Sequence, residues 1–480
     1  MLLGFLLLPG ERRADEAPPR GDSSEAMLAA VARASWPRFR GPNGSGVAID
    51  GELPVHFGPT NQVIWKTPLP SGASSPCLWG DRIFLTSYDG TRLETICLDR
   101  RTGQVAWRRT APATAIEKVT GMGSPAASTP VTDGRRVYVY FGSFGLLSYD
   151  GDGREEWRKP LPTPVTQHGT GTSPILEGDL LLLVSDQDVD AYVLAVNRNT
   201  GQTVWKTERP GCRRGFCTPL IWRDAGEPVL IVPGTLRVVA YRLTDGQPLW
   251  RVDGLPNEMC ASPALGAGLL FVSGWTPGAG ETKFPSFQSL LEQADADKNG
   301  SLSRAEAPPG PAQQHFPYID ANKDGQITRA EWEAMAEIFA KSTNALLAIR
   351  PGGAGDVTTT HLAWRETRGL PYVPSPLFYR DRLYLVKNGG LISCFNATNG
   401  VASYVEQKLG AAGDYYASPV AANGKICVAS RRGVLTVFEA GDVLKVLAQN
   451  ELGETTLATP AVSGHCLYVR TQDHLFAFGE

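Results

Sequence analysis

The sequence predicts an all-β protein, an eight-bladed β-propeller of four-stranded antiparallel blades, with a small α-helical insertion in blade five. A Ser/Thr-Pro pair precedes a β-like run eight times, with prolines at Pro76, Pro130, Pro174, Pro219, Pro263, Pro376, Pro419 and Pro460. Each unit of about 44 residues holds four short strand-like runs separated by turn residues, which is typical of a propeller blade. One interval of 113 residues leaves room for an insertion of about 69 residues.

The four runs of a unit follow one order. A first strand follows the Ser/Thr-Pro pair, an apolar second strand such as residues 137–140 comes next, and the third strand alternates, as in residues 392–396. A fourth strand carries an aromatic residue four positions after a turn glycine, in the pairs Gly103/Trp107, Gly153/Trp157, Gly201/Trp205, Gly246/Trp250 and Gly400/Tyr404. We expect this aromatic to pack between neighbouring blades. The alternative fold, a β-sandwich, would not repeat one motif eight times.

The repeat also predicts how the chain is divided. The expected parts are a leader and linker at 1–34, blades one to five at 35–275, an insert at 276–343, and the remainder of blade five with blades six to eight at 344–480. The eighth unit stops after a third strand at 475–478, whereas an unassigned strand at 63–68 carries Trp65. We expect 63–68 to supply the missing outer strand, because this pairing covers an exposed sheet edge.

Composition excludes two classes of partner. With 46 Lys and Arg against 49 Asp and Glu, the net charge of −3 gives no basic footprint for nucleic acid and no polybasic membrane patch. No run of residues approaches the ~20 apolar positions that a membrane-spanning helix needs. The 52 glycines and 36 prolines suit many short strands joined by tight turns.

Two features concern the cellular compartment. Residues 1–8 are similar to the apolar part of a secretory signal, although no basic segment precedes them, and they predict an exported, periplasmic or extracellular protein. The alternative is a disordered leader of a cytoplasmic protein.

The eight cysteines permit disulfides, but most fall in predicted strands and none forms a CxxC pair, so we expect small buried thiols. They are Cys77, Cys97, Cys212, Cys217, Cys260, Cys394, Cys427 and Cys466.

Residues 98–107 and 196–205 share an Asp/Asn turn, a Thr-Gly-Gln step and a closing Trp. This pattern resembles the repeat of the bacterial PQQ-like, or quinoprotein-like, eight-bladed propeller family, over residues 61–480 apart from the insert. Residues 36–46 look like the segment that precedes such propellers in large exported bacterial proteins. The repeats are also similar to those of the propeller subunit of the outer-membrane β-barrel assembly machinery. The resemblance implies a fold and leaves the chemistry open.

Two acidic loops in the insert match the pattern D-x-[DN]-x-[DN]-G-x5-E at every defined position. Calcium prefers six to eight oxygen ligands, which such a loop supplies from positions 1, 3, 5, 7, 9 and 12. The first predicted site is Asp295, Asp297, Asn299, Ser301, Ser303 and Glu306; the second is Asp320, Asn322, Asp324, Gln326, Thr328 and Glu331. Ser301 and Gln326, at position 7 of each loop, are expected to bind the ion through their backbone carbonyl oxygens. The alternative is a solvated acidic loop that binds no ion.

The residues around the loops predict a paired but unusual EF-hand. Apolar residues at helical spacing precede the first loop and follow the second, and Leu302 and Ile327 are placed to face each other in a short bridge. Pro308, Pro309 and Pro311 cut short the helix that would leave the first loop. We therefore interpret the two predicted calcium sites as structural sites and not as a sensor that opens a groove.

No catalytic constellation stands out, so no residue is assigned to catalysis or to a cofactor. PQQ binding is an open alternative, although the adjacent cysteine pair found in many quinoprotein dehydrogenases is missing. Polar and aromatic residues in the inter-blade loops could line a funnel and bind an anion or sugar: His168, Arg213, Arg214, Asn257, Glu258, Tyr372, Asp414, Tyr415 and Tyr416. The alternative is a polar channel mouth without a ligand. His465 is expected in a strand, as a satisfied core residue.

The sequence thus predicts a calcium-binding PQQ-like propeller that acts as a non-catalytic binding or protein-interaction scaffold in the bacterial cell envelope. Its expected partners are calcium and either another envelope protein or a small ligand at the funnel. The alternative function is a PQQ-dependent alcohol or sugar dehydrogenase.

Overall fold

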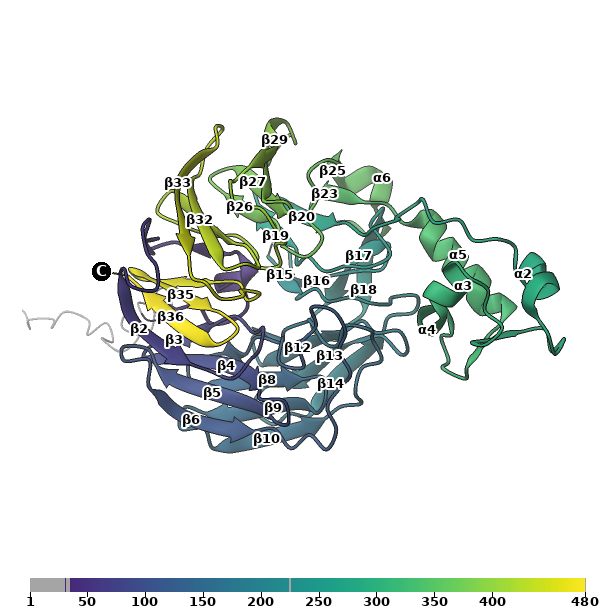
Figure 1. Ribbon diagram of the computed structural model, residues 1–480, viewed down its shortest axis with the longest axis horizontal. Helices are drawn as coiled ribbons and strands as arrows, with labels where there is room; N and C mark the ends of the chain where they lie inside the picture. The colour runs from purple at the N-terminus through teal and green to yellow at the C-terminus, as the bar shows by residue number, and fades with distance from the viewer. Residues whose placement is uncertain (1–30, 32–34, 224–225, 480) are drawn as a thin grey trace, which may run out of the picture.

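The computed structural model describes residue 31 and residues 35–223 and 226–479, so most of the expected leader lies outside the described residues. Within them, eight four-stranded antiparallel blades form a ring, and a helical segment extends from one side of it (Figure 1). The predicted all-β propeller is therefore confirmed.

The strands of each blade run from the centre of the ring outward. Blades one to four consist of β3 (Cys77–Trp79), β4 (Arg82–Tyr88), β5 (Leu93–Asp99), β6 (Val105–Thr110); β7 (Val131–Thr132), β8 (Arg136–Phe141), β9 (Gly145–Asp150), β10 (Glu155–Pro160); β11 (Ile175–Glu177), β12 (Leu180–Ser185), β13 (Tyr192–Asn197), β14 (Thr203–Glu208); and β15 (Leu220–Trp222), β16 (Val229–Gly234), β17 (Arg237–Arg242), β18 (Pro248–Asp253).

Blades five to eight consist of β19 (Ala264–Gly266), β20 (Leu269–Gly274), β23 (Ala345–Ile349), β25 (Leu362–Glu366); β26 (Leu377–Tyr379), β27 (Arg382–Lys387), β28 (Leu391–Asn396), β29 (Ala402–Lys408); β30 (Val420–Ala422), β31 (Lys425–Ala429), β32 (Val434–Glu439), β33 (Lys445–Glu451); and β34 (Ala461–Ser463), β35 (Cys466–Arg470), β36 (His474–Phe478), β2 (Val63–Pro68). The middle strands are buried almost throughout, because each blade is covered on both faces by its neighbours.

Blade eight is closed by the N-terminal strand, as predicted. Strand β2 pairs antiparallel with β36, with Trp65 opposite Ala477 and Lys66 opposite Phe476. Nearby, the rings of Phe57 and Phe478 lie 4.8 Å apart. The pairing leaves β36 with a partner on both sides and joins the two ends of the propeller.

The recurring Ser/Thr-Pro pair has a structural reason at the axis. In the first seven blades, the backbone N–H of the Ser or Thr donates to the hydroxyl of the equivalent residue in the next blade. The seven links are Ser75 to Thr129, Thr129 to Ser173, Ser173 to Thr218, Thr218 to Ser262, Ser262 to Ser375, Ser375 to Ser418 and Ser418 to Thr459, at 2.9–3.1 Å. Each hydroxyl thus satisfies a buried N–H, a contribution of about 1 kcal/mol per bond.

The recurring tryptophan joins blades at the outer edge of the ring. The indole N–H of Trp157 donates to the carbonyl of Arg198 at 2.8 Å, and its ring covers Gly201 of the next blade. The expected packing between blades is confirmed for this residue. The same arrangement recurs in the pairs Trp65/Gly103, Trp107/Gly153, Trp205/Gly246 and Trp364/Gly400.

Residues 36–48 lie across one end of the propeller and contact several blades. Arg38 donates to the carbonyl of Pro219 at 2.8 Å, and Arg40 donates to that of Pro376 at 2.6 Å. Strand β1 (Val47–Ala48) then joins blade seven beside β30, and β24 (Gly355–Asp356) joins blade four beside β18. Both additions pair in parallel, and neither was predicted, because two-residue strands leave no periodic pattern.

One predicted residue is placed differently from expectation. His465 lies in the turn between β34 and β35, where 74% of its side chain is exposed. Its Nδ1 lies 3.1 Å from the Glu52 carboxylate. The core assignment was wrong because the tight turn at Gly464 places residue 465 before the strand begins.

The helical segment lies between β20 and β23 of blade five. Its elements are α2 (Phe287–Ala294), β21 (Leu302–Ser303), α3 (Pro311–Gln314), α4 (Phe316–Ile319), β22 (Gln326–Ile327) and α5 (Arg329–Lys341). Phe287, Leu290, Trp332, Met335 and Phe339 share an apolar core that is separate from those of the blades. Figure 1 shows α4 next to the propeller and α2 at the far end. We call residues 276–343 the insert.

All eight cysteines are free thiols, and six of them are buried. Across the described part of the chain, no helix combines the length and apolar character that crossing a membrane requires.

Candidate calcium loops and an axial cavity

The first acidic loop brings three of its six predicted ligands together. Single carboxylate oxygens of Asp295, Asp297 and Glu306 lie within 4.8 Å of one another. Glu306 accepts hydrogen bonds from the Ser303 backbone and hydroxyl at 2.9 and 2.7 Å, and these bonds lower the pKa of its carboxyl group. Gly300 has φ +81°, so the sharp bend at position 6 suits glycine.

The second loop has an equivalent hydrogen-bond pattern and is more deeply buried. Thr328 and Glu331 form a capping box at the start of α5, which fixes the position 12 carboxylate. Asp320, at position 1, is only 5% exposed. Its Oδ2 accepts from the Gly325 N–H at 3.1 Å, whereas its Oδ1 is buried without a hydrogen-bond partner. A buried, unpaired carboxylate oxygen is costly, and a cation at this position would satisfy it.

The two loops lie back to back through a short bridge. Leu302 pairs with Ile327, as predicted, and both are fully buried. The Ser301 hydroxyl donates to the Gln326 side chain at 2.9 Å, so these two residues link the loops as well as offering their carbonyls. Asn299, Asn322 and Asp324 form hydrogen bonds within their own loops. The donor set of both loops fits a hard cation of the size of calcium.

The second loop is docked on the wall of the propeller through Tyr318 of α4. Arg214 lies over its ring at 3.8 Å and Arg213 lies at 5.4 Å. Arg213 also donates to the Tyr318 carbonyl. Asp188, from the loop after β12, lies 3.4 Å from Arg214 and 3.9 Å from Lys323 at position 4 of the calcium loop. Burial raises the pKa of Asp188, and the cations around it oppose that shift.

A second set of bonds holds the base of the insert. The Asn257 side-chain oxygen accepts from the hydroxyls of Thr276 and Ser342 at 3.0 and 2.9 Å. The Ser342 hydroxyl in turn accepts from the Asn257 backbone N–H at 3.0 Å. Both ends of the insert are therefore tied to one loop of the propeller, beside Glu258.

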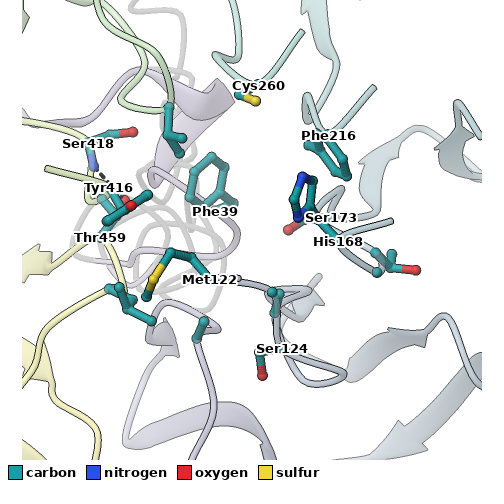
Figure 2. Close-up of a pocket in the computed structure, with 18 of the residues that line it drawn as sticks. Phe39, Met122, Ser124, His168, Ser173, Phe216, Cys260, Tyr416, Ser418 and Thr459 are labelled. Carbon is teal, nitrogen blue, oxygen red and sulfur yellow. Dashed lines mark hydrogen bonds between the residues drawn. The ribbon is translucent and has the colours of Figure 1, made fainter. Parts of the chain in front are cut away.

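An axial cavity of about 390 Å³ lies at the mouth of the ring formed by the Ser/Thr-Pro pairs. Ser173, Ser418 and Thr459 lie around it, and Figure 2 shows Phe39 between the aromatic pair His168 and Phe216 on one side and Tyr416 on the other. The rings of His168 and Phe216 are 6.1 Å apart. The lining is thus hydroxyl-rich at the blades and aromatic between them.

Few of the residues that line the axial cavity carry a charge. Glu258 is the carboxylic acid among them, and its Oε1 accepts from the Tyr372 hydroxyl at 2.7 Å and from the Cys260 thiol at 3.8 Å. Burial and the neighbouring carboxylate raise the pKa of Cys260. In the described part of the chain, no lysine or arginine lines the cavity.

Phe39 lines the cavity, and the buried arginines on either side of it in the chain, Arg38 and Arg40, do not. Burial lowers the pKa of Arg38 and of Arg40 to about 9. Neither of them lines the axial cavity.

The funnel prediction is correct for part of its residues. The cavity is lined by His168, Glu258, Tyr372 and Tyr416, whereas Arg213, Arg214 and Asn257 hold the insert. Asp414 lies 3.7 Å from Arg431, and Tyr415 is buried in the core. The prediction missed Phe39, Met122 and Phe216. Phe39 could not be recognised as a lining residue from the sequence. It stands between two arginines in the lead-in segment, and the sequence alone does not show that this segment lies on the axis.

Pyrroloquinoline quinone would meet no lysine or arginine side chain in this lining. The molecule is a tricarboxylate, which favours cationic or N–H donors, and the side-chain donors of the lining are hydroxyls, the Cys260 thiol and the His168 imidazole.

Comparisons with known proteins agree with this architecture. The family model described as outer membrane protein assembly factor BamB matches residues 48–168 and 94–253, and the EF hand model matches residues 314–336. The EF hand match covers the second acidic loop. No curated protein matches the chain.

Three solved structures share the fold. BamB from Moraxella catarrhalis is 13% identical with a TM-score of 0.54, and the match covers 87% of this chain and 98% of that one. A europium-containing methanol dehydrogenase is 11% identical with a TM-score of 0.59, over 95% and 100% of the two chains. The computationally designed Ika8 protein is 10% identical with a TM-score of 0.54, over 88% and 100%. At these identities the likeness concerns the fold alone.

The chain is therefore an eight-bladed β-propeller whose residues 48–253 match the BamB family model and whose insert matches an EF hand, as a PQQ-like propeller with an EF-hand would. The EF-hand indicates a calcium-binding propeller. Because the structural neighbours include both BamB and a methanol dehydrogenase, fold similarity does not separate a binding role from a catalytic one.

Proposed function

We propose that this protein is a calcium-stabilised, non-catalytic binding scaffold of the bacterial cell envelope, which holds a ligand or a segment of a partner protein at its axial cavity. The observation that carries the proposal is the docking of the insert. Arg213 and Phe216 belong to one loop, and Asn257 and Glu258 to another; the first member of each pair holds the insert, and the second lines the cavity.

Calcium would be held in the first loop by Asp295, Asp297, Asn299, Ser301, Ser303 and Glu306, and in the second by Asp320, Asn322, Asp324, Gln326, Thr328 and Glu331. Calorimetric titration of the full chain tests this assignment. We expect two binding events, with Glu306→Gln and Glu331→Gln each removing one, since position 12 supplies a bidentate ligand. Glu333→Gln, an exposed residue of α5 outside both loops, is the control and should leave both events intact. A wild-type chain that takes up no calcium would refute the assignment.

The alternative function, a PQQ-dependent alcohol or sugar dehydrogenase, is tested by reconstitution. The full chain is incubated with the quinone and calcium, and dye reduction is followed with alcohols and aldoses as substrates. We expect neither saturable quinone binding nor dye reduction, because the cavity lining lacks cationic side chains for the three carboxylates. Turnover that requires both the quinone and the intact chain would overturn the scaffold proposal.

The proposed envelope location rests on the apolar start of the sequence and on the similarity to a family described as an outer membrane assembly factor. Cell fractionation of the full-length chain tests it, and recovery in the cytoplasmic fraction would contradict it.

A protein partner is tested by site-specific photo-cross-linking in the cell envelope. A benzophenone amino acid replaces Tyr416 at the cavity, and in a control chain it replaces Val446 on the outer strand β33. We expect one discrete adduct from position 416 and none from position 446. Equal labelling at both positions would count against the cavity as the binding surface.

A further inference from the structure

We propose that the axial cavity selects an organic cation, a quaternary ammonium or protonated amine on an apolar body, with Glu258 as its counter-charge and the aromatic residues around it as its walls. The inference rests on the proposed function, since it names the chemistry of the ligand that the cavity would hold.

The first observation is the position of Glu258. It is 8% exposed and lines the cavity. The groups that donate to it, the Tyr372 hydroxyl and the Cys260 thiol, are neutral. Among residues 35–223 and 226–479, Glu258 forms no ion pair, in contrast to Asp186, which is buried against Arg209 at 2.6 Å. A buried carboxylate without a counter-charge is unfavourable, and a cationic ligand in the cavity would supply one.

The second observation is the aromatic lining. Phe39, Phe216, Tyr372 and Tyr416 all line the cavity, and Figure 2 shows Phe39 between Phe216 and Tyr416. The negative faces of aromatic rings attract cations, and the attraction is strongest where water is excluded, as in sites for quaternary ammonium groups. The Tyr372 ring is fixed edge to face against Trp275 at 5.8 Å, so this wall is preformed.

Arg38 and Arg40 are buried cations that flank Phe39 in the chain. Their guanidinium groups donate to the carbonyls of Pro219 and Pro376. Neither lines the cavity, so an anionic ligand has no direct donor from them. Glu258, the acid that lines the cavity, therefore determines that a positively charged ligand is preferred. A preference for anions would instead mean that the arginines act through Phe39.

Binding of matched small probes to the calcium-loaded full chain tests the inference. The probes are choline, its uncharged isostere 3,3-dimethylbutan-1-ol, and benzoate as an aromatic anion. We expect choline to bind at least about tenfold more tightly than the isostere, and benzoate not to compete, because cation–π and charge contacts act on the first probe alone. Equal affinity for choline and the isostere, tighter binding of benzoate, or no binding of choline would each overturn the inference.

Single substitutions in the cavity test where choline binds. Glu258→Gln should weaken choline binding at least about tenfold and leave the isostere unchanged. Glu117→Gln is the matched control, because Glu117 is equally buried at 8% exposed but does not line the cavity. Tyr416→Leu should weaken choline binding while keeping Glu258. If choline fails but position 416 still cross-links a partner, the scaffold proposal stands and the cation inference falls.

Discussion

The contact between Trp157 and Gly201 is the sharpest test of how the blades are held together. In Gly201→Ala, the new Cβ would lie 2.6 Å from Trp157 Cε3, at a backbone φ of +71°. The left-handed backbone costs about 1 kcal/mol for alanine, and forcing a methyl group against a fixed ring costs about 1–3 kcal/mol more. We expect the free energy of unfolding to fall by about 2–4 kcal/mol in total.

Gly178→Ala is the matched control. Gly178 also has a positive φ, +53°, but nothing lies within 4 Å of the position of its Cβ. We expect only the backbone cost, about 1 kcal/mol. Urea denaturation of both variants, followed by tryptophan fluorescence and far-UV circular dichroism, compares the two losses on one scale.

A double-mutant cycle separates the ring contact from the backbone. Trp157→Leu removes the ring, so in this background Gly201→Ala should cost no more than Gly178→Ala does. Equal destabilisation by the two glycine variants in the wild-type chain, or an unchanged cost of Gly201→Ala without the ring, would refute the interblade role of the tryptophan.

Three further predictions concern buried charges and the insert. Asp186→Asn should lower the stability by about 3–5 kcal/mol in chemical denaturation, because it leaves the fully buried Arg209 without its partner, whereas an unchanged midpoint would contradict this. Tyr318→Ala should make the insert more sensitive to limited proteolysis while calcium still binds the first loop, since it removes the ring that Arg214 covers; unchanged digestion would count against docking. Burial raises the pKa of Glu117 from 4.5 to about 7, so the folded state holds this proton more tightly than the unfolded state does, and the associated stability is present below pH 4.5 and lost as the pH rises through about 7. Glu117→Gln should therefore raise the melting temperature relative to the wild type at pH 8 but not at pH 4.5, and an equal difference at both pH values would contradict this assignment.

The architecture could be predicted from the sequence because the same four-stranded blade is repeated eight times. The Ser/Thr-Pro pair and the glycine–tryptophan pair each form a contact between neighbouring blades, so they recur at a fixed period. Trp364 serves the same contact in blade five and was not predicted, because the insert separates β20 from β23 and interrupts the count.

The candidate site was less predictable, because its parts come from distant segments. The calcium loops are contiguous, so their pattern could be read directly. In contrast, the cavity lining joins Phe39 of the lead-in to residues of separate inter-blade loops, and a repeat pattern does not state which of those loop residues point inward. The two arginines expected at the funnel instead contact Tyr318 of the insert, a partner that only the three-dimensional structure brings near.

Hydrogen–deuterium exchange of the full chain with and without calcium tests the link between the loops and the propeller most directly. We predict that calcium slows exchange in residues 295–331 and also in the two propeller loops at 209–217 and 255–260, because these loops carry the contacts that hold the insert. Exchange at the outer strand β33 should not change. Protection confined to the acidic loops, with no effect at 209–217 or 255–260, would contradict the coupling of calcium to the cavity wall.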